Sequence, residues 1–219
     1  MTHEEVAQFL SQHPDFFARH PEVLANVAIP HPQDGHAVSL VERQSLIQRE
    51  RIKSLELRLT EMLRHGEEND AIADRIVHWA RVLLSETDPA RLPRTLLDEL
   101  LRQFSVPFGA LRLWGVAPAY AEHDWAQPAG DDIIRLASSM QAPFCGSNVG
   151  FEAAGWMAPD PATIRSLAMM PLRIGGDPAS FGLLALGSPD PDRFQITMGT
   201  AFLSRIAELA SAALARLRA

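Results

Sequence analysis

Apolar residues recur at different spacings along the 219-residue chain, and each change of spacing marks a new part. The first part, residues 1–38, repeats a short pattern: His13-Pro14-Asp15-Phe16-Phe17 is followed by His20-Pro21-Glu22-Val23-Leu24. Proline suits the first position of a helix and keeps the residue before it out of the helical conformation. We therefore expect short helices here, with the aromatic and aliphatic pair of each repeat buried. Ile29 to Gly35, with two prolines, is expected to be a linker.

Residues 39–88 contain no proline and a single glycine, Gly66, which predicts a long helical stalk. Ile52, Leu55, Leu59 and Met62 are spaced alternately by three and four residues, as in the seam of a coiled coil. Only about two heptads are apolar, fewer than the three or four of a free coiled coil. We expect the stalk to pair with a second copy, with help from flanking elements. The alternative is a helix packed on its own domain.

The third part, residues 89–219, combines both periods and predicts an α+β domain. Amphipathic helices are expected over 91–106, 131–140 and 195–217, and strands over 110–116, 166–174 and 181–187. Gly175-Gly176-Asp177-Pro178 between the last two strands predicts an antiparallel hairpin. The expected architecture is an antiparallel sheet flanked by helices, preceded by the N-terminal helical arm and the stalk.

This order of elements resembles a GAF domain, and Leu167 to Gly187 match its hairpin pattern. The whole chain resembles the bacterial family called domain of unknown function 484, which is GAF-like. The residues that carry this resemblance are Phe9-Leu10, His13 to Phe17, Ala37 to Gln44, Cys145-Gly146, Leu186 to Asp190, Arg193-Phe194, Met198 to Thr200 and Phe202-Leu203. The resemblance implies a GAF-like fold and a sensory or regulatory class, without a substrate.

Charge and cysteine content narrow the class of protein. A formal net charge of −7 argues against nucleic-acid binding, since that affinity comes from Lys and Arg neutralising phosphates. No membrane-spanning run or signal peptide is recognisable, and the single cysteine, Cys145, rules out an internal disulfide. We expect a cytoplasmic protein that does not associate with membranes.

No motif points to catalysis, a metal or a cofactor. The GAF domains that bind bilins have a histidine directly after the cysteine, whereas Gly146 follows Cys145 here; a reactive cysteine is the less favoured alternative. Free methionine sulfoxide reductases, which share the GAF fold, depend on several cysteines. The eight histidines fit no metal motif, and there is neither a Gly-x-Ser-x-Gly elbow nor a phosphate loop with its lysine. We therefore expect no enzyme activity.

The resemblance implies a ligand pocket near Phe144 to Met157, because this segment lies where GAF domains cover their cavity. The predicted ligand-binding residues are Trp114, Cys145, Gly146, Phe151, Trp156, Met157 and Arg165. Arg112, Arg165 and Arg173 would supply positive charge for an acidic ligand. Alternatively they point to solvent, which strand alternation favours for Arg112.

The sequence thus predicts a non-enzymatic regulatory or sensory module that binds a small molecule or a partner protein and dimerises through its helices. A second hypothesis is a structural adaptor whose cavity is filled by Trp114, Phe151 and Trp156. A third, an unrecognised enzyme, would require titratable residues clustered around one cavity.

Overall fold

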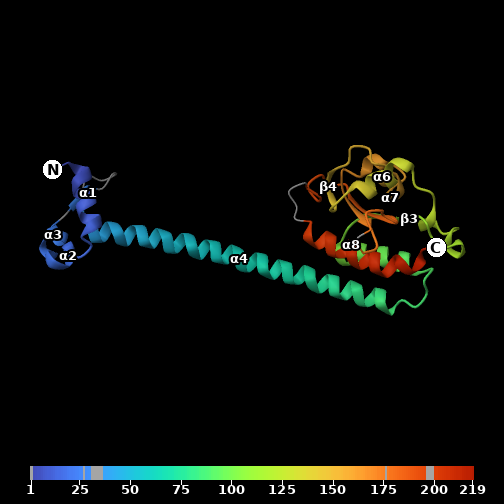
Figure 1. Cartoon of the computed structure of the whole chain (residues 1–219), viewed down its shortest axis with the longest axis horizontal. Coiled ribbons are helices and arrows are strands. Elements are labelled where there is room, and N and C mark those ends of the chain that lie inside the picture. The colour runs from blue at the N-terminus through green and yellow to red at the C-terminus, as the bar shows by residue number, and fades with distance from the viewer. Residues whose placement is uncertain (1, 27, 31–36, 176, 196–199) are drawn as a thin grey trace. The chain divides into compact units, whose positions relative to one another are not determined.

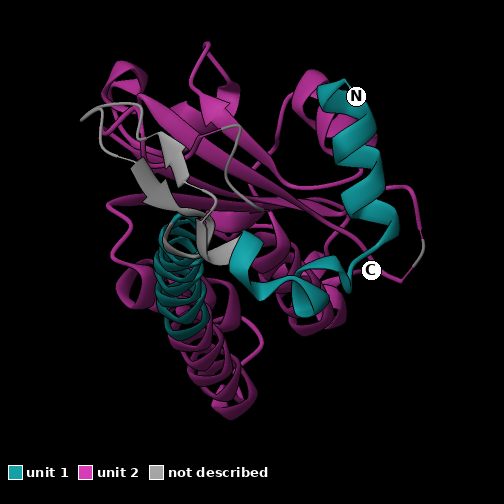
Figure 2. Ribbon diagram, turned by 90° about the vertical axis from the view of Figure 1, so that its left-hand side faces the viewer, with its two compact units in different colours: residues 1–67 teal, residues 68–219 magenta. Residues whose placement is uncertain are grey.

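A computed structural model describes residues 2–26, 28–30, 37–175, 177–195 and 200–219 (Figure 1). The chain divides into two compact units, residues 1–67 and 68–219 (Figure 2). The division falls within the 46-residue helix α4, Leu40–Ser85, which therefore contributes to both units. The domain boundaries expected at residues 39 and 89 stay predictions.

The first unit begins with three short helices, as the proline repeats predict. They are α1 (His3–Gln12), α2 (Phe16–Arg19) and α3 (Pro21–Asn26). Thr2 caps α1, because its hydroxyl accepts the Glu5 backbone N–H at 3.3 Å while the Glu5 carboxylate accepts the Thr2 N–H at 2.8 Å. Pro21 opens α3 as expected, whereas α2 starts at Phe16, two residues beyond its proline.

Two expectations for this unit need correction. Phe16 and Phe17 are half-buried rather than buried, and the Phe16 ring contacts those of Phe9 and Phe17 edge-on at 5.7 and 5.4 Å. In the second repeat Val23 is 37% exposed, and the Leu24 side chain lies outside the described part. The start of the expected linker is a strand: β1 (Ala28–Pro30) pairs antiparallel with β2 (Ala37–Ser39). Residues 31–35 of that linker lie outside the described part of the chain.

The second unit is built on a four-stranded antiparallel sheet, which confirms the expected α+β class. Its strands are β3 (Phe108–Leu113), β4 (Phe144–Ser147), β5 (Ser166–Leu172) and β6 (Gly182–Ser188), in the order β3-β6-β5-β4. The predicted β5–β6 hairpin is confirmed, with Leu172 opposite Gly182 and Leu167 opposite Gly187. Every residue of β5 and β6 is buried. These strands are therefore nearly continuous apolar runs, without the alternation of apolar and polar residues that a strand with one solvent-facing side shows.

Helices cover both faces of the sheet (Figure 1). On one face, α5 (Leu92–Phe104), α8 (Ala201–Leu214) and the last turns of α4 share a core cluster with Met170 and Leu184. On the other face, α6 (Asp131–Ser139) and α7 (Glu152–Met157) share a second cluster with Leu167 and Met169. Neighbouring residues of one strand thus enter different clusters, because successive side chains of a strand point to opposite faces.

Helices α5 and α6 begin and end within two residues of their expected bounds, whereas α8 begins at Ala201 rather than at Gln195, which is not helical. Trp79 of α4 is fully buried, and its Nε1–H donates to the Leu96 carbonyl of α5 at 3.0 Å. Ser105 ends α5 with a left-handed φ of 50°, just before Pro107. After α8, the 3₁₀ turn Ala215–Leu217 completes the closing helix, while residues 196–199 of that expected helix lie outside the described part. Among the described residues, no helix has the length and apolar character needed to cross a membrane.

Candidate functional site

The predicted pocket wall is packed with side chains. Trp114, Phe151, Trp156 and Met157 all pack against the core cluster between the sheet and helices α6 and α7. The Met157 sulfur lies so close to β6 that a Cβ on Gly187 would come within 2.9 Å of it. The structure therefore brings four of the predicted residues together, as parts of a core.

Polar partners hold these aromatic rings in place. Trp114 donates its Nε1–H to the Ser180 carbonyl at 2.6 Å, two residues before β6. The Arg112 guanidinium lies 5.2 Å from the centre of the Trp156 ring and donates to the Pro128 carbonyl at 3.2 Å. Arg112 is thus half-buried on the α7 side of the sheet rather than turned fully to solvent, because the indole ring attracts the cation.

Cys145 belongs to the opposite face of the sheet. It is 6% exposed and packs in the cluster of α5 and α8, while its neighbour Phe144 packs on the α7 side. Burial raises the pKa of the Cys145 thiol, because an apolar environment disfavours the thiolate. This environment is typical of an inert structural cysteine. Gly146 is also buried, opposite Leu167 in the β4–β5 ladder.

Arg165 is exposed at the start of β5, apart from the aromatic group. Its backbone N–H donates to the Ser188 carbonyl at 2.8 Å, and its carbonyl accepts the Asn148 N–H at 2.9 Å. The Asn148 amide itself donates to the carbonyls of Pro161 and Ile164 and accepts the N–H groups of Gly150 and Phe151. The glycine-bounded loop after β4 is therefore held as a structural turn.

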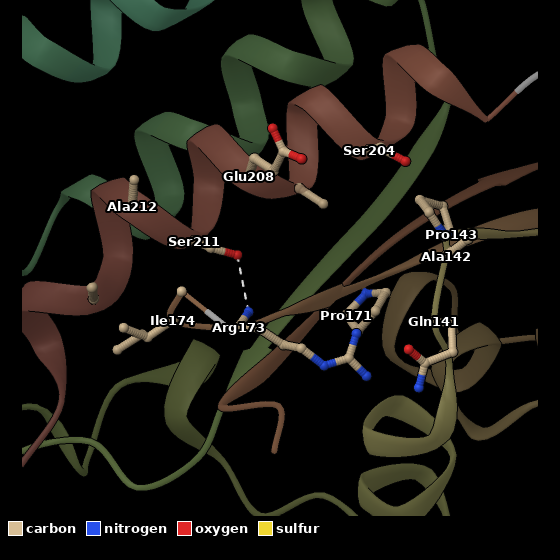
Figure 3. A pocket seen from close by; sticks show the side chains of 13 residues that line it. Gln141, Ala142, Pro143, Pro171, Arg173, Ile174, Ser204, Glu208, Ser211 and Ala212 are labelled. Carbon is tan, nitrogen blue, oxygen red and sulfur yellow. Dashed lines mark hydrogen bonds between the residues drawn. The ribbon is translucent and has the colours of Figure 1, made fainter. Parts of the chain in front are cut away.

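A well-formed groove lies elsewhere, between α8, the end of β5 and the loop that enters β4 (Figure 3). Its volume is about 660 Å³. The α8 wall consists mostly of small side chains, and Pro143, Pro171 and Ile174 form much of the rest. Although all seven predicted ligand-binding residues are described, none of them lines this groove. This groove could have been predicted from the spacing of Ser204, Ala207 and Ser211, which places small residues on one face of α8.

Arg173 is the cation of this groove (Figure 3). Its backbone N–H donates to the Ser211 hydroxyl at 3.0 Å, and its guanidinium donates to the carbonyls of Pro178, Ala137 and Ser138 at 3.1, 2.9 and 2.9 Å. The last two carbonyls end α6, where the helix dipole favours a positive charge. Arg173 therefore ties β5, α6 and α8 together.

A smaller groove of about 330 Å³ lies between α5 and β3, and of the seven predicted residues, all of them described, Trp156 alone lines it. Within the described ranges, no three His, Cys, Asp or Glu side chains are grouped so that they could hold a metal ion.

Residues 1–218 match the sequence model of the family described as "Protein of unknown function, DUF484". The chain belongs to this family. It is 26% identical over 215 residues to the uncharacterized protein YigA of Salmonella typhimurium LT2, a match that covers 92% of this chain and 86% of that protein. Identity to YigA of Escherichia coli K12 is 26% over 214 residues, with the same coverage.

Two solved structures similar to this DUF484 protein contain comparable arrangements of helices and strands. One is the GAF domain from an Acinetobacter phosphoenolpyruvate-protein phosphotransferase, with a TM-score of 0.47, 12% identity, and coverage of 66% of this chain and 92% of that chain. The other is the free methionine-R-sulfoxide reductase from Neisseria meningitidis in complex with its substrate, with a TM-score of 0.48, 15% identity, and coverage of 66% and 88%. Similarity at this level says nothing about ligand or activity.

Proposed function

We propose that this DUF484 protein is a non-enzymatic regulatory adaptor that works as a homodimer through contacts with other proteins. The observation that carries the proposal is the filled face between the sheet and α7. Trp114, Phe151 and Trp156 are half-buried there and pack against the core cluster, which favours the adaptor over a sensor with a cavity at that place.

Exposed apolar side chains support a role in protein contacts. Along α4, the exposed fractions are 55% for Ile52, 62% for Leu55, 56% for Leu59 and 70% for Met62. Large apolar side chains gathered on one face of a helix are typical of an interaction surface, because leaving them in water is unfavourable. We infer that a second copy of the chain covers this face.

The groove beside α8 favours a second candidate function, the sensing of a small molecule. Its volume of about 660 Å³ lies within the range of known ligand sites, roughly 300–1,000 Å³. Its polar groups suit a small polar ligand; they are Gln141, Arg173, Ser204, Glu208 and Ser211. Three carbonyls already accept from the Arg173 guanidinium, so we rank this function second.

Native mass spectrometry of the gently purified protein, before and after denaturation, separates the two functions. The adaptor predicts a dimer without a bound small molecule. A reproducible extra mass that is lost on denaturation would contradict the adaptor and support the sensor. A monomer without an adduct would contradict the homodimer.

If a small molecule is retained, a pair of variants locates it. Ser204→Trp fills the groove and should abolish retention, whereas Leu209→Trp, at an α8 position outside the groove lining, should leave it unchanged. Retention by both variants would place the ligand elsewhere.

A further inference from the structure

The exposed stripe of α4 has the spacing of a coiled-coil seam. Ile52, Leu55, Leu59 and Met62 are separated by three, four and three residues and so occupy alternating a and d positions. If the heptad positions are numbered onward through Gly66, Ile76 and Leu83 also occupy d positions. These two side chains are buried within the second unit, with exposed fractions of 6% and 4%. The part of the seam that needs a partner is therefore residues 52–62.

A second copy of the chain fits this seam best. Two identical helices with this spacing pack knobs into holes along their whole apolar stripe. The first heptad has Ile52 at a and Leu55 at d, the combination that favours two parallel strands. We propose that two copies pair in parallel and in register over residues 52–62; this inference rests on the proposed dimeric adaptor and specifies how its protomers meet.

Charges beside the seam fix the direction of pairing. Arg51 is at a g position and Glu56 at the following e position, and in a parallel pair the g residue of one helix faces this e residue of the other. Arg51 of each copy would then meet Glu56 of the other, twice per dimer by symmetry. Neither side chain has an ion-pair partner within the described part of its own chain, so both are available.

Antiparallel pairing brings like charges together. The register that buries all four apolar layers pairs Ile52 with Met62 and Leu55 with Leu59 of the other copy. In antiparallel coiled coils e faces e and g faces g, so this register sets Glu56 against Glu56 and Arg58 against Arg58. Like charges at such close range are unfavourable in both places. In the parallel pair Glu56 meets Arg51 instead, and Arg58 at g faces Leu63 at the following e position, so both repulsions are absent.

Disulfide trapping in the full-length chain tests the direction of pairing. Cys145→Ala removes the native thiol, and Leu55→Cys then places one cysteine at a d position, where parallel helices bring the two Cβ atoms within bonding range. Leu57→Cys is the matched control, because position 57 is also exposed but points away from the seam. On mild oxidation we expect a covalent dimer of the Leu55→Cys protein to form at least about tenfold faster than that of the control.

The other possible outcomes of the trapping experiment contradict either the parallel pairing or the homodimer itself. Equal rates for the two cysteines in a protein that light scattering shows to be dimeric would overturn the parallel stalk but leave the dimeric adaptor standing. In a Leu55→Cys, Leu59→Cys protein, links between positions 55 and 59 would establish the antiparallel pair instead. A monomer at all concentrations would overturn both the inference and the homodimer.

Charge reversal provides an independent test. Glu56→Arg should raise the dimer dissociation constant on the order of tenfold at low salt, because both ion pairs become repulsions. Arg51→Glu combined with Glu56→Arg restores opposite charges and should return the constant to within about threefold of the original. The difference should shrink in 1 M salt, where the Debye length is only about 3 Å. Unchanged dimerisation of Glu56→Arg at low salt would overturn the pairing of Arg51 with Glu56, since in the antiparallel arrangement this change replaces one like-charge contact with another.

Discussion

Replacing Trp114 tests whether the face between the sheet and α7 is filled. Trp114→Phe removes the N–H that donates to the Ser180 carbonyl at 2.6 Å, a loss of about 1 kcal/mol. Trp114→Ala also removes the ring from its core cluster. Truncating a fully buried Trp costs about 3–5 kcal/mol, and because Trp114 is half-buried we expect about 2–3 kcal/mol for Trp114→Ala.

Urea unfolding followed by tryptophan fluorescence measures the loss of unfolding free energy in the second unit, which contains Trp114. All four tryptophans lie within residues 68–219, so the remaining three report on the unit that contains Trp114. With a urea dependence of about 2 kcal/mol per molar, Trp114→Ala should lower the midpoint by about 1–1.5 M and Trp114→Phe by about 0.5 M. Val149→Ala, at a position that is 80% exposed, is the control and should not move the midpoint. A Trp114→Ala midpoint within 0.2 M of the original would refute the filled face and revive a ligand cavity there.

Three further predictions concern single residues of the second unit. Hydrogen bonds from Arg102 lower the pKa of Glu99 in the folded protein. The ionised Glu99 therefore stabilises the fold above the pKa of an unfolded carboxyl group, and this stabilisation is lost as the pH falls through the lower pKa of the folded state. The urea midpoint should accordingly vary less between pH 3 and 6 in Glu99→Gln than in the original protein. Cys145 is buried with a raised pKa, so an aromatic disulfide reagent at pH 8 should label it at least about a hundredfold more slowly in the native protein than in urea; equal rates would show an accessible thiol. Gly182→Ala should cost about 2 kcal/mol or more, because the new Cβ would come within 2.8 Å of the Arg112 carbonyl oxygen, and a change below 0.5 kcal/mol in the unfolding free energy would contradict this contact.

The sequence predicted most elements of the fold because their signals are local. The proline repeats, the proline-free stretch and the Gly175 to Pro178 turn each act within a few residues, and the helices and the hairpin follow from them. It did not predict β4, because four residues are too short to show a period and the pairing of β4 with β5 depends on a segment about 20 residues away.

The alternation of side chains along a strand explains why the predicted ligand-binding residues lie on both faces of the sheet. Phe144 and Cys145 are neighbours in β4 and therefore point to opposite faces of the sheet, so Cys145 does not join the aromatic group of Trp114 and Phe151. This separation follows from the sequence once β4 is recognised as a strand. The ligand-binding role of the seven residues stays a prediction.

The α+β class, the hairpin, the short helices of the first unit and the apolar stripe of the stalk could all be predicted from the sequence, since each depends on residue type and spacing along the chain. Only the three-dimensional packing decides whether the predicted pocket is open, because its volume depends on how Trp114, which follows β3, and Phe151 and Met157, at the two ends of α7, pack against the same core cluster. It also decided that Arg173 binds the carbonyls that end α6, a contact between residues 35 or more positions apart. Spacing along a chain can fix which residues share one helix face or one strand face, whereas the space left between two elements depends on side chains from both.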